Sequence, residues 1–221
     1  MKDEPRWHAA VAVIIALALY MRLPPKLTFG PVWAAPLLVL VLLVPLLVLG
    51  SHRARLSMLI RSCSIGLIAT LNFFNIASVV LLIRDLVAGA PGHHTITAID
   101  LLSGGGLIWA TNVIVFALWF WEFDSDGPDA RVKVASAREF EGADFLWPQM
   151  SLDPARLACA DRAWKPRLVD YVYLSFTNAL AVSPTDTMPL SRWAKMLMLV
   201  ESLISFTTVG LILARSVNIL T

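Results

Sequence analysis

One acidic residue, Glu201, lies inside the last long apolar run of the chain, which covers about residues 192–219. If Ser191 caps this helix, Glu201 lies about ten residues in, roughly 15 Å at 1.5 Å per residue. That depth is near the middle of a hydrocarbon core about 30 Å thick. A carboxylate there is costly and indicates a functional residue. Ser205 and Thr208 follow at helical spacing, so the polar stripe faces a pore or proton path. The alternative is that Glu201 is neutral, or that it hydrogen-bonds behind a shorter helix and holds the loop in place.

A second set of polar residues directly precedes this helix. Residues 168–182 are apolar but shorter than the roughly 20 residues that a spanning helix needs. We expect a half-helix, a turn and then a full helix, which is the layout of a re-entrant pore loop. The pore-loop candidates are Thr177, Asn178, Ser183, Pro184, Thr185, Asp186 and Thr187.

Each of these polar groups also has a structural interpretation. Thr177 and Asn178 either line a constriction or satisfy backbone groups that the turn leaves unpaired. Asp186 either attracts cations at a pore mouth, or it or Thr187 caps the last helix, with Pro189 in the first turn.

Other polar residues lie within earlier apolar segments. Asn72 and Asn75 fall in residues 59–83, and Asn112 falls in residues 99–121. Hydrogen bonds between helices explain such residues, and a solute path is the alternative. The run Gly104–Gly106 predicts a close approach by another helix. Residues 124–127 resemble half of a calcium loop, but a solvated turn explains them better.

The composition is that of an integral membrane protein. The 221 residues are 57% hydrophobic and 15% charged, with a mean hydropathy of +0.70, whereas soluble domains carry about 25% charged residues. The motifs of hydrolases, metalloproteases and thiol redox enzymes are absent from the sequence, so we expect no enzyme, no catalytic residues, no cofactor and no metal site. The net charge of +2 gives no support for nucleic-acid binding.

The apolar runs predict an all-α membrane protein with about five transmembrane helices and a re-entrant half-helix before the last one. The expected spans are residues 7–23, 32–50, 59–83, 99–121 and 192–219. This gives a four-helix region (1–122), a polar connecting loop (123–167) and a pore-loop-like region (168–221). Basic residues concentrate after the second span and in the long loop, which places both in the cytoplasm and the C-terminus outside.

The last region resembles the pore domain of two-helix potassium channels over about 50 of 221 residues. The residues that match that family's spacing around the pore loop are Ser175-Phe176-Thr177, Val182, Asp186 and Pro189. Farther along, the matching residues are Ala194, Lys195, Glu201 and Ala214-Arg215. The filter glycines are absent, because residues 181–186 are Ala-Val-Ser-Pro-Thr-Asp, so the resemblance does not imply potassium selectivity. A potassium-channel pore loop enters from outside, which conflicts with the orientation that the charges predict. In that family, the Glu at the position that matches Glu201 lies beside the pore helix.

The whole chain is also similar to a family of uncharacterised bacterial inner-membrane proteins.

These observations predict an ion-channel-like, multi-pass protein of the inner membrane that passes small cations or other small solutes. The resemblance implies a homo-oligomer in the lipid bilayer, a tetramer by analogy. The alternatives are a non-conducting membrane scaffold or regulatory module and, third, a small-solute transporter, although the sequence has no inverted repeat.

Overall fold

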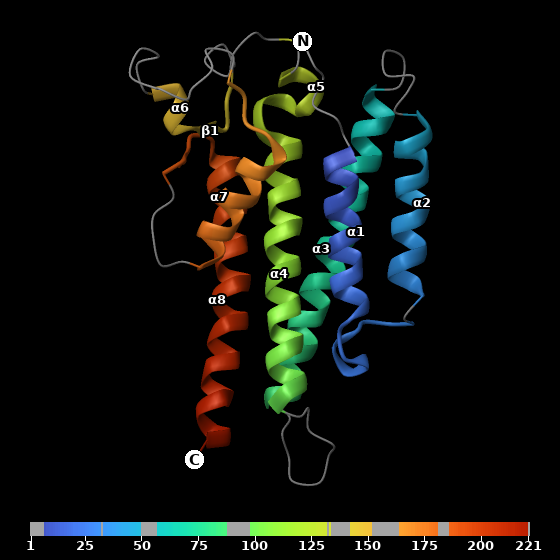
Figure 1. The fold of residues 1–221 in the computed structure, drawn as a ribbon, viewed down its shortest axis with the longest axis vertical. Coiled ribbons are helices and arrows are strands. Elements are labelled where there is room, and N and C mark those ends of the chain that lie inside the picture. Colours follow the sequence, from blue (N-terminus) through green and yellow to red (C-terminus); the bar gives the residue numbers. More distant parts are fainter. Residues whose placement is uncertain are drawn as a thin grey trace.

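The computed structural model describes residues 7–31, 33–49, 57–87, 98–131, 133, 142–151, 164–180 and 186–220. These residues form a bundle of helices that run roughly along one direction (Figure 1). Its longer helices are α1 (Trp7–Met21), α2 (Ala34–Leu49), α3 (Ser57–Val87), α4 (Ala98–Phe123), α7 (Leu168–Leu180) and α8 (Arg192–Leu220). The short elements are η1 (Pro25–Leu27), η2 (Asp124–Asp126), α5 (Pro128–Arg131), β1 (Phe145–Leu146), α6 (Pro148–Ser151) and β2 (Met188–Pro189).

Three of the described helices, α3, α4 and α8, are long and apolar enough to cross a membrane. This confirms the predicted helical fold with apolar helices long enough to span a membrane. The other two expected spans, α1 and α2, are apolar but have 15 and 16 residues, which is about 22–24 Å at 1.5 Å per residue. That α1 and α2 cross the membrane stays a prediction.

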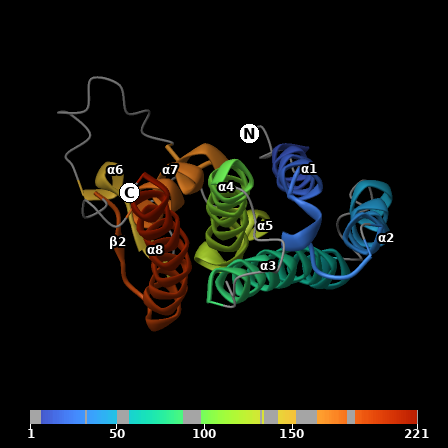
Figure 2. The same ribbon diagram turned by 90° about the horizontal axis from the view of Figure 1, so that it is seen from below.

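Helix α4 is the centre of the bundle. Seen along the bundle, α1, α2 and α3 lie on one side of α4, and α7 and α8 lie on the other (Figure 2). Within their most apolar stretches, 61% of the residues of α4 are buried inside the chain, against 44% for α3 and 17% for α8. Of these three helices, α4 is therefore covered most by the rest of the chain, and α8 is covered least and lies at the periphery.

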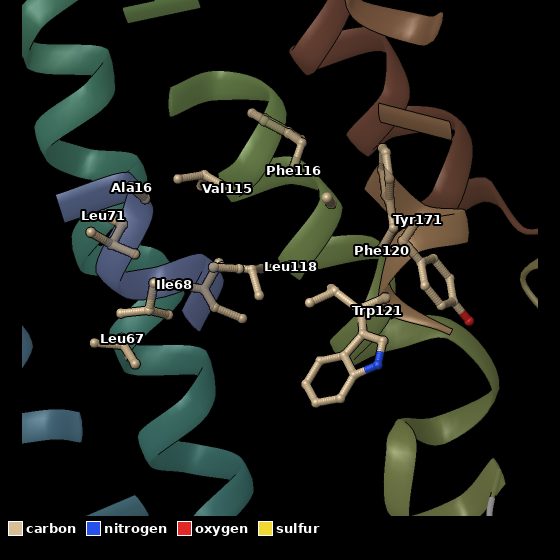
Figure 3. Packing of buried hydrophobic residues seen from close by; sticks show 14 of the residues in the cluster. Ala16, Leu67, Ile68, Leu71, Val115, Phe116, Leu118, Phe120, Trp121 and Tyr171 are labelled. Carbon is tan, nitrogen blue, oxygen red and sulfur yellow. The ribbon is translucent and has the colours of Figure 1, made fainter. Parts of the chain in front are cut away.

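The main apolar core surrounds the second half of α4. Ala16 of α1 and Leu71 of α3 pack on the side that carries Val115, and Tyr171 of α7 packs on the side that carries Phe120 (Figure 3). All five residues are buried. Apolar burial of this kind contributes about 25 cal/mol per Å² in water, but within a bilayer the close packing itself holds the helices together.

Helices α7 and α8 begin at the same end of the bundle and run in the same direction (Figure 1). The ring of Trp193, in the first turn of α8, lies 5.4 Å from the ring of Phe123, the last residue of α4. In the first turns of α7, Tyr171 hydrogen-bonds Asp124, the residue after α4. Helix α7 has 13 residues and α8 has 29, or about 20 Å and 43 Å at 1.5 Å per residue, so α7 ends about halfway along α8.

A two-stranded antiparallel ribbon joins the long connection to the segment that precedes α8. Phe145 pairs with Pro189, and Leu146 pairs with Met188. The N–H of Leu190 then donates to the carbonyl of Asp144 at 2.8 Å. Residues 188–190 are thus fixed at the end of the bundle where α7 began.

Local hydrogen bonds explain where α7 and α8 begin. The Asp170 carboxylate accepts from the N–H of Arg167 at 2.7 Å, as in half of a capping box. Burial raises the pKa of Asp170, and this hydrogen bond opposes the effect. At α8, the hydroxyl of Ser191 accepts from the N–H of Ala194 at 3.0 Å. The alternative in which Asp186 or Thr187 caps α8 is therefore wrong, because Ser191 is the cap and Pro189 lies in β2.

The close approach predicted at Gly104–Gly106 is confirmed for two of these glycines. A Cβ on Gly105 would lie 2.2 Å from Cδ1 and 2.6 Å from Cγ1 of Ile212 in α8, and a Cβ on Gly104 would lie 2.5 Å from Leu27 Cδ1. A Cβ on Gly106 would meet no atom within 4 Å. Gly105 therefore lets α8 pack directly against the first half of α4.

We expect Gly105→Leu to lower stability by about 1–3 kcal/mol, because the side chain would overlap Ile212 and force the helices apart. Gly106→Leu, in the next position of the same helix, is the matched control and is expected to cost little or to stabilise. Thermal unfolding in detergent compares the two variants. Equal midpoints for both would contradict this packing.

Candidate functional site

Glu201 lies at the junction of α4, α7 and α8 and is completely buried. Its Oε1 forms a short hydrogen bond with the hydroxyl of Ser175 in α7. Its Oε2 accepts a hydrogen bond of 2.6 Å from Nδ2 of Asn178, one turn farther along α7. Both carboxyl oxygens are therefore partnered, and both side-chain partners belong to the short helix.

Asn178 and Ser175 also bind the neighbouring backbones. Asn178 Nδ2 donates to the carbonyl of Met198 at 2.9 Å, and Asn178 Oδ1 accepts from the hydroxyl of Ser202 at 3.1 Å. Ser175 Oγ lies 2.7 Å from the carbonyl oxygen of Val113 in α4. The second half of α7 is thus held to both α4 and α8 by polar contacts in addition to apolar packing.

The same network reaches α3 through Asn112. Nδ2 of Asn112 donates to the hydroxyl of Ser205 at 2.9 Å and to the carbonyl of Glu201 at 3.3 Å. Its Oδ1 accepts from Nδ2 of Asn75 at 3.2 Å. We call the whole set the Glu201 cluster, and its members are Asn75, Asn112, Ser175, Asn178, Glu201, Ser202 and Ser205.

The structure brings together most of the polar residues that the sequence predicts within the membrane, but two of them do not join the cluster. Thr208 is buried and donates to the carbonyl of Ile204 in its own helix at 2.8 Å. Asn72 lies one turn before Asn75, and its buried Oδ1 has no hydrogen-bond partner among the described residues.

The pore-loop candidates are only partly within the described residues. Thr177 donates to carbonyls of its own helix, Tyr173 and Leu174, at 2.9 and 3.0 Å. Asp186 is exposed, and Thr187 is buried. Ser183, Pro184 and Thr185 lie outside the described residues.

A second polar cluster holds the start of α7, and the sequence did not predict it. Oδ2 of Asp124 accepts from the Tyr171 hydroxyl at 2.6 Å, and its Oδ1 accepts from the N–H of Asp144 at 3.0 Å. The Ser125 hydroxyl also donates to Oδ1 at 3.0 Å. Asp124 is 1% exposed, so the solvated turn expected at residues 124–127 is wrong at this residue. The buried carboxylate fixes the end of α4, the start of β1 and the start of α7 relative to one another.

Arg131 also belongs to this second polar cluster, which we call the Asp124 cluster. Its guanidinium is buried and donates to the carbonyls of Asp124 and Trp121 at 2.6 and 2.8 Å. It also lies 5.3 Å from the centre of the Tyr171 ring, within the range of a cation–π interaction. Lys165 donates to the carbonyl of Arg131 at 2.9 Å, so the chain leading into α7 is fixed here too.

The arrangement has the chemistry of a positioning site. Within the described ranges, no three His, Cys, Asp or Glu side chains lie close enough together to hold a metal ion. The side-chain partners of Glu201 are a hydroxyl and an amide, both uncharged, and they can hydrogen-bond the carboxyl group and orient α7 against α8.

We expect Asn75→Leu to lower stability by about 0.6–1.7 kcal/mol, because Asn112 Oδ1 would lose its donor from α3. Asn72→Leu, one turn away, is the matched control and is expected to be neutral or stabilising, because it removes a buried oxygen without a partner. Unfolding in detergent measures both. A larger loss for Asn72→Leu than for Asn75→Leu would be inconsistent with the described network.

We expect Tyr171→Phe to cost about 1–3 kcal/mol, because it removes a hydroxyl that donates to a buried carboxylate. Tyr173→Phe is the control in the same helix, since Tyr173 is 57% exposed, and little change is expected. Limited proteolysis near residue 167, together with the unfolding midpoint, reports whether α7 has loosened. If both variants behaved alike, Asp124 would not hold α7.

No protein-family model, no curated protein and no solved structure matches this chain.

Proposed function

We propose that residues 168–187 form a hairpin that enters the membrane and leaves it on the same side. Copies of the chain then assemble so that the hairpin tips surround a path for small cations or other small solutes. The protein on this proposal is a multi-pass, ion-channel-like protein of the inner membrane, with α1 and α2 as its remaining spans.

The observation that carries this proposal is the shared starting end of α7 and α8. Both helices begin beside the end of α4 and run antiparallel to it, and α7 ends about halfway along α8. The ribbon between β1 and β2 holds the chain at the starting end before α8 begins. A half-helix followed by a return to the same side is the layout of a re-entrant loop, which membranes tolerate only where protein or a water-filled cavity surrounds it.

The electrostatics at the end of α7 favour a cation. The last carbonyls of a helix carry a partial negative charge, and α7 ends part of the way along α8, away from both ends of the bundle (Figure 1). The exposed carboxylate of Asp186 adds negative charge on the returning side of the hairpin. A potassium-type filter is not part of the proposal, because residues 181–186 contain no glycine.

In this proposal Glu201 holds the half-helix in place and does not line the path. Its carboxyl group is completely buried behind α7, and its side chain contacts Ser175 and Asn178 on the inner side of that helix. The outer face of α7 carries Val169, Tyr173 and Phe176, which are 69%, 57% and 43% exposed. That face is the one available to a neighbouring copy or to lipid.

The position of α8 supports self-association. In its most apolar stretch only 17% of the residues are buried inside the chain, although it follows the half-helix and contacts it directly. In a homo-oligomer, the uncovered faces of α7 and α8 from neighbouring copies meet around an axis. A tetramer follows by analogy with two-helix channels.

A specific observation also favours a second function, a non-conducting membrane scaffold. Three polar side chains in the second half of α7 donate within the chain: Ser175 and Asn178 to groups of α4 and α8, and Thr177 to its own helix. The long connection is tied to the hairpin by the β1–β2 ribbon, which would present it as a binding platform.

Cation flux into liposomes distinguishes these functions. We expect the wild type to conduct, and Asp186→Asn to reduce cation flux severalfold, because one carboxylate per copy is lost near the path. Asp126→Asn is the matched control. It removes an exposed carboxylate after α4, and Asn tolerates the positive φ of 61° at that position. Flux that both variants reduce equally would contradict a path at the hairpin, and absence of flux under several cations and potentials would support the scaffold.

A further inference from the structure

The hydroxyl of Ser175 faces two oxygen atoms with a single proton to donate. Its Oγ lies 2.7 Å from the carbonyl oxygen of Val113, and it also contacts Oε1 of Glu201 at hydrogen-bonding distance. A serine hydroxyl has one O–H donor and otherwise accepts. If Ser175 shares this one hydrogen between both oxygens, as Thr177 does between two carbonyls, each contact is only a weaker three-centre bond. Two full hydrogen bonds need a second proton that Ser175 does not supply.

The backbone carbonyl of Val113 cannot supply it, since a carbonyl only accepts. Glu201 is the remaining source. If its carboxyl group were ionised, Ser175 would have to share one hydrogen between Oε1 of Glu201 and the carbonyl of Val113, and neither oxygen would receive a full hydrogen bond. A protonated carboxyl group resolves both contacts and leaves its carbonyl oxygen to accept from Asn178.

We infer that Glu201 is a proton-binding site: its carboxyl O–H donates to Ser175, and the Ser175 hydroxyl donates to the carbonyl of Val113. The bound proton thereby completes a chain of hydrogen bonds from α8 through α7 to α4. This assignment is independent of conduction and holds equally for a scaffold.

The surroundings suit a neutral carboxylic acid. The groups that face Glu201 and its cluster are Asn75 from α3, Asn112 from α4, and Ser175 and Asn178 from α7, all of them uncharged. The described charged residues of α3, α4, α7 and α8, apart from Glu201 itself, lie in turns near the helix ends, and they are Arg61, Arg84, Asp85, Asp100, Glu122, Asp170, Arg192 and Lys195. An ionised carboxylate at this depth would have no cation beside it among these groups, and its burial would be costly.

Asn178 is only partly buried, whereas Glu201 and Ser175 are fully buried, so Asn178 is the side of the carboxyl group that is least covered by the chain. Loss of the proton leaves Ser175 unable to satisfy both neighbours. We therefore expect α7 to be held firmly while Glu201 is neutral and to loosen as rising pH ionises it.

Infrared difference spectroscopy of the full-length protein in liposomes tests the assignment. The wild type is expected to show the carbonyl band of a protonated carboxylic acid at neutral pH, and Glu201→Gln is expected to lack it. Gln can donate to Ser175 and accept from Asn178, so it mimics the neutral acid. Hydrogen exchange in α7 should therefore stay near the wild-type rate in Glu201→Gln and should no longer rise at alkaline pH. Glu201→Ala, which leaves buried partners unsatisfied, should raise it by about tenfold or more.

A carboxylate band in place of the acid band, or Glu201→Gln loosening α7 as much as Glu201→Ala, would overturn the assignment. Ser175→Ala gives a second test that does not depend on the folding of a Glu201 variant. It removes the acceptor of the carboxyl proton, so the acid band is expected to shift to higher frequency. An unshifted band would show that Glu201 does not donate to Ser175.

Discussion

A carboxyl group placed at the middle of an apolar helix must find hydrogen-bond partners, and the position of Glu201 imposes this constraint on the last third of the chain. Its two oxygens are satisfied by Ser175 and Asn178, which lie one turn apart on one side of α7. Those two side chains in turn bind backbone carbonyls of α4 and α8. The depth and rotation of the short helix therefore follow from the need to partner one buried polar group.

The start of the same helix is fixed by an equivalent constraint at the end of the bundle. Asp124 is buried between α4, the segment before β1 and Tyr171, and the buried guanidinium of Arg131 binds the backbone around it. With polar contacts at both ends and apolar packing between them, α7 has little freedom to slide along α8. A half-helix of 13 residues has too few internal bonds for such precision alone, so tertiary contacts must supply it.

The sequence predicted the parts of this arrangement that depend on local pattern. Unbroken apolar runs predicted α3, α4 and α8, and the short run with a turn predicted a half-helix that begins at Leu168, as α7 does. The isolated carboxylate in the last run identified Glu201 from its depth alone. The Asp124 cluster was missed because Asp124 and its partner Tyr171 are 47 residues apart along the chain. In addition, Asp124 stands in a turn sequence of a kind that is normally solvated. The sequence left the cap of α8 open between Ser191 and Asp186 or Thr187, because all three residue types are good caps. Only the path of β2 and the hydrogen bond of Ser191 decide between them.

On our proposal, the hairpin before α8 enters and leaves the membrane on one side. Single cysteines placed at Arg167 and Leu190, in a chain whose Cys63 and Cys159 are replaced by serine, test it directly with a membrane-impermeant maleimide. Lys26→Cys reports the opposite end of the bundle. We expect Arg167→Cys and Leu190→Cys to be labelled from the same side, the cytoplasmic one by the charge rule, and Lys26→Cys from the other. Labelling of Arg167→Cys and Leu190→Cys from opposite sides would mean that the chain crosses the membrane between them, which would contradict the account.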